Sequence, residues 1–201
     1  MGRKRRCEQI EDGDSFHAMW QSHNQSFLLE DDLIKHRYYE LLIKYAPKYG
    51  VKIYSYSFMS THPHLYGILS TVIEFSKFQH VVNTLVSRTI NNNFERRGQV
   101  IRERYKIFPI RGESQHLAAM LYIDMNPVKA GIVKHPNLFP WSSFKFYAYG
   151  SKDPLITPSP AYLSLGTNGR MRQKHYVELI NLRMEEEKRK EQLKRNFNNL
   201  F

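Results

Sequence analysis

The sequence has a single cysteine, Cys7, among 201 residues. One cysteine excludes an internal disulfide and a cysteine-rich zinc site, and it fits a reducing compartment such as the cytoplasm. No stretch approaches the roughly eighteen consecutive apolar residues that a membrane-spanning helix needs. The N-terminus is basic but lacks a following apolar run, so we expect no secretory signal.

Acidic residues are also scarce. The chain has 19 Asp and Glu against 30 Lys and Arg, which gives a formal net charge of +11. A surplus of that size favours a polyanionic partner, with nucleic acid ahead of a membrane surface. Hydrophobic residues make up 41% of the chain and aromatic residues 13%, so the chain has the composition of a folded domain and not of a disordered one.

Hydrophobic patterning predicts an α+β sandwich. Phe16, Ala18 and Trp20 recur at every second position and so share one side, as in a strand. We then predict a helix over 29–50, strands over 51–58 and 64–70, a helix over 74–97, a strand over 104–112 and a helix from residue 113. This order is typical of an antiparallel sheet with helices packed on one face and its other face free.

Two prolines give more local expectations. Pro109 predicts that its strand lies at a sheet edge or ends there, because proline cannot donate to the ladder. Pro127 predicts that its helix stops near Met125–Asn126, since the residue before proline disfavours the α region. Residues 139–150 are expected to form a short helix or turn.

We divide the chain into four segments. These are a basic N-terminal arm over 1–13, a folded domain over 14–150, a proline-containing loop or linker over 151–170, and a charged C-terminal helix over 171–201. The last helix carries Glu to Lys or Arg pairs four residues apart, in the favourable order. It is either a solvated tail or a basic helix that contacts DNA or another chain.

Two histidines lie one residue apart in the run Thr61-His62-Pro63-His64. Side chains at i and i+2 share a strand face, so His62 and His64 can aim both imidazoles at one point. Histidine is the commonest metal ligand, but two ligands do not make a stable site. The pair is therefore either half of a metal site or two polar residues on an exposed sheet face.

Tyr122 and Asn126 are candidates for the missing half, because residues four apart share one face of a helix. Each also has a plain structural interpretation: a core tyrosine with a satisfied hydroxyl, and an asparagine that ends the helix. With the histidine pair they form a coherent site. Two imidazoles and an amide oxygen could hold a divalent cation, Mg²⁺ or Mn²⁺, beside a phenol nucleophile.

Four sequence blocks resemble one family. YSFMSTHPHLYGIL resembles the motif of HUH single-strand endonucleases, and LYIDMNPVKAGIVKHPNLFPWSSFKFY resembles the tyrosine-bearing block of single-tyrosine HUH transposases. Within the insertion-sequence transposase superfamily, these blocks are most similar to the REP-associated tyrosine transposases, as are RERYKIFPI and DSFHAMWQSHNQ. The likeness spans about Asp14 to Gly150, which makes 14–150 the transposase domain.

The resemblance implies a ferredoxin-like or RRM-like sheet, with Tyr122 as the catalytic nucleophile and His62, His64 and Asn126 as metal ligands. It also implies cleavage of single-stranded DNA beside hairpins through a 5′-phosphotyrosine, by a monomer or homodimer at the bacterial nucleoid. Pro63 departs from the family, which usually has Val, Phe or Ile between the histidines. The second interpretation is therefore a protein that binds hairpin DNA without cutting it, and the third is an RNA-binding protein.

Basic and aromatic residues alternate around the strand at 104–112. Cations can follow the phosphates of a single strand while aromatic rings stack on its bases, at about 1–3 kcal/mol per base. The alternatives are an ordinary half-buried strand and, for the N-terminal arm, a solubilising tail. The candidate DNA-binding residues are Arg5, Arg6, Arg102, Arg104, Tyr105, Lys106 and Arg111.

Overall fold

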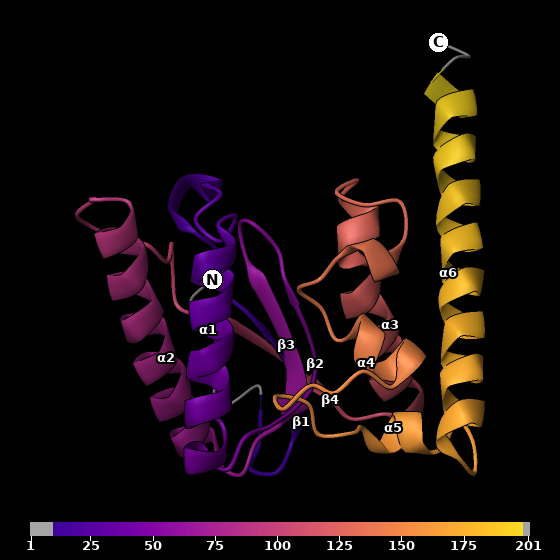
Figure 1. Cartoon of the computed structure of the whole chain (residues 1–201), viewed down its shortest axis with the longest axis horizontal. Helices are drawn as coiled ribbons and strands as arrows, with labels where there is room; N and C mark the ends of the chain where they lie inside the picture. Colours follow the sequence, from indigo (N-terminus) through magenta and orange to yellow (C-terminus); the bar gives the residue numbers. More distant parts are fainter. Residues whose placement is uncertain (1–9, 199–201) are drawn as a thin grey trace, which may run out of the picture.

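The computed structural model describes residues 10–198, so the candidates Arg5 and Arg6 lie outside the described residues. A four-stranded antiparallel sheet forms the centre of the fold (Figure 1), and its strand order is β2-β3-β1-β4. The strands are β1 (Ser15–Met19), β2 (Lys52–Phe58), β3 (Pro63–Ile68) and β4 (Lys106–Ile110). The strand that contains Pro109 is an edge strand, as predicted.

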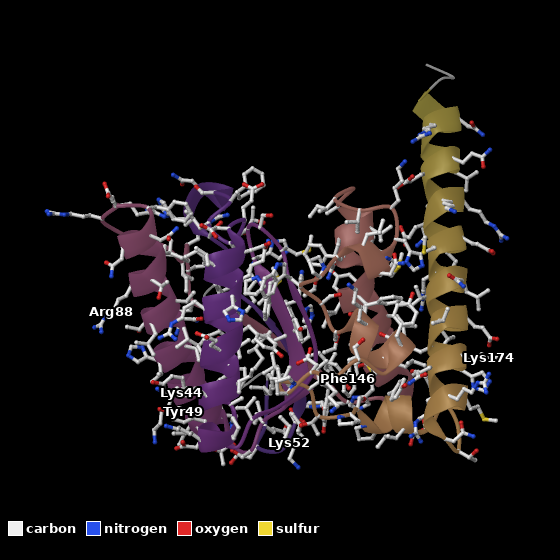
Figure 2. The ribbon with its side chains drawn as sticks, in the orientation of Figure 1. Lys44, Tyr49, Lys52, Arg88, Phe146 and Lys174 are labelled. Atoms are coloured by element: carbon white, nitrogen blue, oxygen red, sulfur yellow. The ribbon has the colours of Figure 1, made fainter. Side chains whose placement is uncertain are left out.

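Helices α1 (Asp32–Tyr45) and α2 (Val72–Asn93) cover one face of the sheet (Figure 1). Both begin with a side-chain cap: Asp31 accepts from the Leu33 amide, and Thr71 accepts from the Glu74 amide. Side chains fill the space between these helices and the strands (Figure 2). Phe16 of β1 is fully buried there, with its ring centroid 4.4 Å from that of Phe75.

The second face is covered over β2 and β3, so the expectation of a free face was wrong for that half of the sheet. Helix α3 (Glu113–Lys129) packs on β2 and β3, and α4 (Phe144–Tyr149), α5 (Pro160–Leu163) and α6 (Gly169–Asn198) lie on the same side (Figure 1). The reason is that β2 and β3 are buried along almost their whole length, on both faces. Tyr66, for example, is fully buried on the α3 face and shares a 2.8 Å hydrogen bond with His116.

Pro127 does not end its helix where the sequence predicted. Helix α3 continues through it to Lys129. A proline in the last turn costs only one backbone hydrogen bond. Burial of Ile123, Met125 and Pro127 itself holds this turn in place.

Residues 151–170 are mostly irregular, but they pack closely on the domain. Leu155, Ile156 and Tyr162 are buried, and Ile156 forms a parallel bridge with Ile53 of β2. The chain then enters α6, which extends beyond the other helices (Figure 1). No described helix is long and apolar enough to cross a membrane.

One buried carboxyl ties the layers on the α3 side together. Asp124 of α3 accepts hydrogen bonds from the Ser143 hydroxyl at 2.8 Å and from the Tyr176 hydroxyl of α6 at 2.7 Å. Ser143 in turn shares a 2.7 Å hydrogen bond with Ser55 of β2. The sheet, α3, the start of α4 and α6 therefore meet at Asp124, which is fully buried.

This carboxyl should make the stability of the protein depend on pH. Burial raises the pKa of Asp124 to about 7, although the hydrogen bonds from Tyr176 and Ser143 lower it. A carboxyl with a raised folded-state pKa contributes stability that is complete below its unfolded pKa and lost as the pH rises through the folded one. The stabilisation of wild type over Asp124→Asn should therefore shrink from about pH 4 to about pH 7.

Urea unfolding of both proteins across this pH range measures the difference. The control is Glu178→Gln, which removes an exposed carboxylate from α6 and should leave the pH dependence of wild type unchanged. A wild-type advantage that stays constant or grows with pH contradicts the assignment.

Candidate active site

The two histidines of the Thr61-His62-Pro63-His64 run lie where β3 begins. Pro63 is the first residue of β3 and pairs with Phe58 of β2. The first position of a strand tolerates proline, because its missing donor is not needed there. A hydrogen bond of 3.1 Å from the Met59 amide to the His62 carbonyl closes the turn before it. The strand thus accommodates Pro63 without losing its pairing with β2.

The aromatic rings of the predicted site come together on the α3 face of the sheet. The ring centroids of His62 and His64 are 4.7 Å apart, and that of Tyr122 is 6.0 Å from His64. His64 is 2% exposed, whereas Tyr122 is 44% exposed. Buried His64 and half-buried His62 therefore lie beside an accessible phenol.

A third histidine, which the sequence interpretation missed, joins this cluster. The Nε2 atom of His17 in β1 lies 2.9 Å from Nδ1 of His64, at hydrogen-bond distance. The His17 ring centroid is 5.8 Å from that of Tyr122. The alternation of Phe16 and Ala18 does place His17 on the opposite strand face, but only the pairing of β1 with β3 brings it to His64.

These histidines are held neutral. Burial, with a smaller contribution from the charge of His62, lowers the pKa of His17 to about 4. Burial also pushes the pKa of His64 well below its usual value, helped by His17 and His62, and it lowers the pKa of His62. Neutral imidazoles have a free lone pair at neutral pH, which is the state that metal coordination requires.

Asn126 lies one helical turn beyond Tyr122 and is 9% exposed. Its Nδ2 atom is buried and has no hydrogen-bond partner among the described residues. The oxygen and nitrogen of an amide are interchangeable by a flip, so either atom can occupy that position. An unsatisfied buried amide is costly, and a bound group would relieve that cost.

The donor set fits a cation only if the amide takes part. Within residues 10–198, no group of three or more His, Cys, Asp or Glu side chains could hold a metal ion. His17 does not fill the gap, because its Nε2 atom faces His64. Two imidazoles, one amide oxygen and solvent would make a mixed set of the kind that Mn²⁺ or Mg²⁺ accepts.

A lysine lies over the exposed phenol. The Nζ atom of Lys129 is 5.0 Å from the centroid of the Tyr122 ring. The same ammonium group is 3.6 Å from a carboxylate oxygen of Glu187 in α6.

The predicted DNA-binding residues divide into two groups. Arg102, Arg104 and Lys106 are exposed. Tyr105 is only 7% exposed, and its ring packs against Phe75 of α2, so the expectation that it stacks on bases is corrected. The physical reason is strand alternation: Tyr105 and Ile107 face the core, while Lys106 and Phe108 face the opposite way.

Arg111 is exposed but committed to two acidic residues. Its guanidinium lies 2.8 Å from Asp14 and 3.1 Å from Glu11. These two carboxylates already partly balance the charge of Arg111. A residue that binds phosphate is expected to have its charge available instead.

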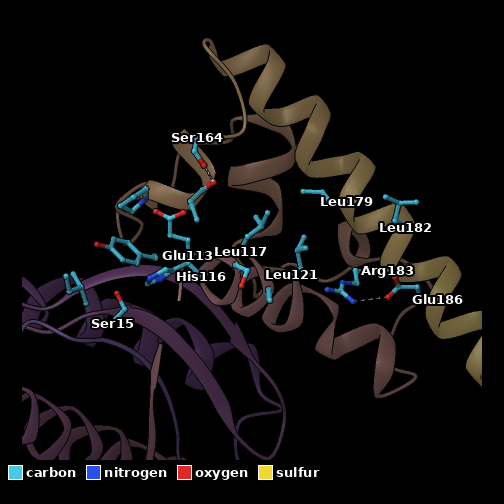
Figure 3. Close-up of a pocket in the computed structure, with 16 residues that line it drawn as sticks. Ser15, Glu113, His116, Leu117, Leu121, Ser164, Leu179, Leu182, Arg183 and Glu186 are labelled. Atoms are coloured by element: carbon cyan, nitrogen blue, oxygen red, sulfur yellow. Dashed lines mark hydrogen bonds and ion pairs between the residues drawn. The ribbon is translucent and has the colours of Figure 1, made fainter. Parts of the chain in front are cut away.

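A pocket of about 750 Å³ lies away from the histidine cluster, between α3, α5, α6 and the sheet (Figure 3). Its lining is largely apolar, with Leu117 and Leu121 from α3 facing Leu179 and Leu182 from α6. None of the three histidines lines it, nor does Tyr122. The chemistry-bearing side chains therefore identify the site better than the size of the cavity does.

The chain is similar to known proteins in sequence and in fold. The family model of IS200-like transposases matches residues 13–126. A REP-associated tyrosine transposase, solved bound to a REP hairpin, shares the fold with a TM-score of 0.59 and 21% identity, over 79% of this chain and 93% of that one. A candidate transposase from Deinococcus radiodurans R1 is 14% identical over 57% of this chain and 90% of that one, with a TM-score of 0.40.

No curated protein sequence matches the chain significantly. The family match nonetheless covers more than half of the chain, from the turn before β1 to Asn126. It includes every histidine of the cluster and Tyr122. The chain belongs to the IS200-like transposase family.

Proposed function

We propose that this protein is a metal-dependent single-stranded DNA endonuclease and strand transferase that cuts beside DNA hairpins, as a REP-associated tyrosine transposase. The observation that carries the proposal is the accessible phenol of Tyr122 next to buried His64 and half-buried His17, whose pKa values are both lowered. The net charge of +11 suits a DNA substrate. The structural relative bound to a REP hairpin supports a hairpin as the feature beside which the strand is cut.

The reaction is a phosphoryl transfer to tyrosine. The Oη atom of Tyr122 attacks the phosphorus of a DNA phosphodiester and loses its proton as the new bond forms. The bond from phosphorus to the 3′ oxygen breaks, and this oxygen takes up a proton to become a hydroxyl. Attack by a 3′-hydroxyl on the phosphotyrosine later reverses these steps and restores Tyr122.

Lys129 assists at the phenol. Its ammonium group stabilises the charge that develops on Oη during attack, because it lies over the Tyr122 ring. The same ammonium group can also contact the phosphate, because the phosphate is negatively charged like the phenolate. Glu187 keeps this lysine near the site when DNA is absent.

His62, His64 and Asn126 would hold a divalent ion, Mg²⁺ or Mn²⁺. When bound, such an ion neutralises charge on the phosphate and makes phosphorus more electrophilic. His17 acts behind His64: with Nδ1–H of His64 donating to Nε2 of His17, the bond would fix the orientation of the His64 ring and leave its Nε2 lone pair free for coordination. His17 is thus a positioning residue in this proposal.

The alternative is a protein that binds hairpin or single-stranded DNA without cutting it. Two observations favour this alternative. Pro63 stands where the family usually has Val, Phe or Ile, and within residues 10–198 no group of three or more His, Cys, Asp or Glu side chains could hold a metal ion. The two functions differ in whether a covalent protein–DNA adduct forms.

Replacing the nucleophile should abolish that adduct. Hairpin oligonucleotides labelled at the 3′ end and incubated with Mn²⁺ or Mg²⁺ should yield a labelled, denaturation-resistant species with wild type. Tyr122→Phe should lose this species and keep DNA binding, because the ring under Lys129 remains. The matched control is Tyr149→Phe, which changes another exposed tyrosine, on α4, and should keep the adduct. Tight binding by wild type without an adduct, across many hairpins and both metals, would falsify cleavage.

Removing the residue behind His64 should weaken metal binding. Loss of such an outer partner typically costs about 10- to 100-fold in metal affinity. We expect a loss of that size in His17→Ala, smaller in His17→Gln, measured as free Mn²⁺ by electron paramagnetic resonance during titration. The control is His80→Gln, which changes an exposed histidine of α2. Equal affinity in wild type and His17→Ala would show that His17 does not position His64.

A further inference from the structure

The α3 face of the sheet is only half covered. Helix α3 packs on β2 and β3, and the other half of this face belongs to β1 and the edge strand β4. The register places His17 opposite Phe108 and Met19 opposite Lys106. These four side chains form what we call the open strip, beside the Tyr122 ring.

Phe108 is the prominent residue of the open strip. Its side chain is 51% exposed, whereas that of the preceding residue, Ile107, is buried in the core. Its ring centroid lies 6.3 Å from that of His17, and the His17 centroid lies 5.8 Å from that of Tyr122. The three rings form a row that leads from the phenol to the edge of the sheet.

The charge around the row suits a polyanion. Lys106 is exposed on the same strand face as Phe108, and Arg104 is exposed just before the strand. Glu103 balances Lys106 only loosely, at 3.7 Å and with both side chains open to solvent. An exposed aromatic ring flanked by cations is the combination with which proteins hold single strands, since bases stack and phosphates pair.

We propose that the open strip is a subsite for an unpaired nucleotide of the strand whose phosphate reaches Tyr122. The base stacks on Phe108, and Lys106 holds the adjoining phosphate. This inference rests on the proposed function, because it assigns the place of the substrate strand next to the nucleophile. Continuity of the ring row with Tyr122 favours single-stranded DNA over a second copy of the chain as the occupant.

The test measures binding separately from cleavage. Hairpin oligonucleotides with unpaired flanking bases, one replaced by 2-aminopurine, are titrated in the absence of added metal. Stacking quenches the fluorescence of 2-aminopurine. Binding to wild type should therefore lower the fluorescence when 2-aminopurine occupies the flanking position that stacks on Phe108. Phe108→Ala should lose the quenching and bind about 5- to 150-fold more weakly, the fold-change that corresponds to one stacked base.

Matched variants separate stacking from folding. Phe108→Trp should keep both binding and quenching, and Phe108→Leu should keep the fold but lose the quenching. The control is Phe94→Ala, which removes another exposed phenylalanine, at the end of α2. Circular dichroism checks that each variant is folded.

Wild-type affinity and quenching in Phe108→Ala at every flanking position would overturn the inference while leaving adduct formation by Tyr122 intact. If wild type quenches the fluorophore but forms no covalent adduct, the result contradicts the proposed cleavage and not the subsite. A change in sedimentation of Phe108→Ala from dimer to monomer, without a change in DNA binding, would assign the open strip to a second copy and also overturn the inference.

Discussion

The buried carboxyl of Asp124 is the point on which the arrangement of the candidate site depends. It fixes the side of α3 that faces α6 and the start of α4 through Tyr176 and Ser143. With 3.6 residues per turn, positions two before and two after Asp124 lie on the opposite side of the helix. Those positions are Tyr122 and Asn126, so anchoring one side of α3 sets what the other side presents to the sheet.

The same anchoring links the C-terminal helix to the phenol. Tyr176 holds α6 against α3 at Asp124. Five residues later along α3, Lys129 lies between Glu187 of α6 and the ring of Tyr122. The charged part of α6 is therefore more than a solvated appendage, because one of its carboxylates positions a cation of the site. A change in α6 near Glu187 is transmitted to Tyr122 by a single ammonium group.

Local patterns in the sequence predicted the elements and half of the cluster. Alternation and spacing predict β1, the edge position of β4, and the shared face of His62 and His64, because these depend only on residues close in the chain. His17 was missed because it lies 47 residues from His64 and depends on strand register. The partners of Asp124 lie 19 and 52 residues away in the sequence, so local patterns could not reveal them. Alternate residues of the strand point to opposite faces, and the pattern around 104–112 did not show that Tyr105 faces the core while Phe108 is exposed.

The depressed pKa values of the histidine cluster have a consequence for competition at the site. Protons and metal ions bind the same imidazole lone pairs, so in most histidine sites a cation must displace protons as the pH falls toward 6. Burial lowers the pKa of both proposed imidazole ligands, His64 and His62. A cation held by these two rings, as proposed, would therefore compete with fewer protons as the pH falls than it would at solvent-exposed histidines.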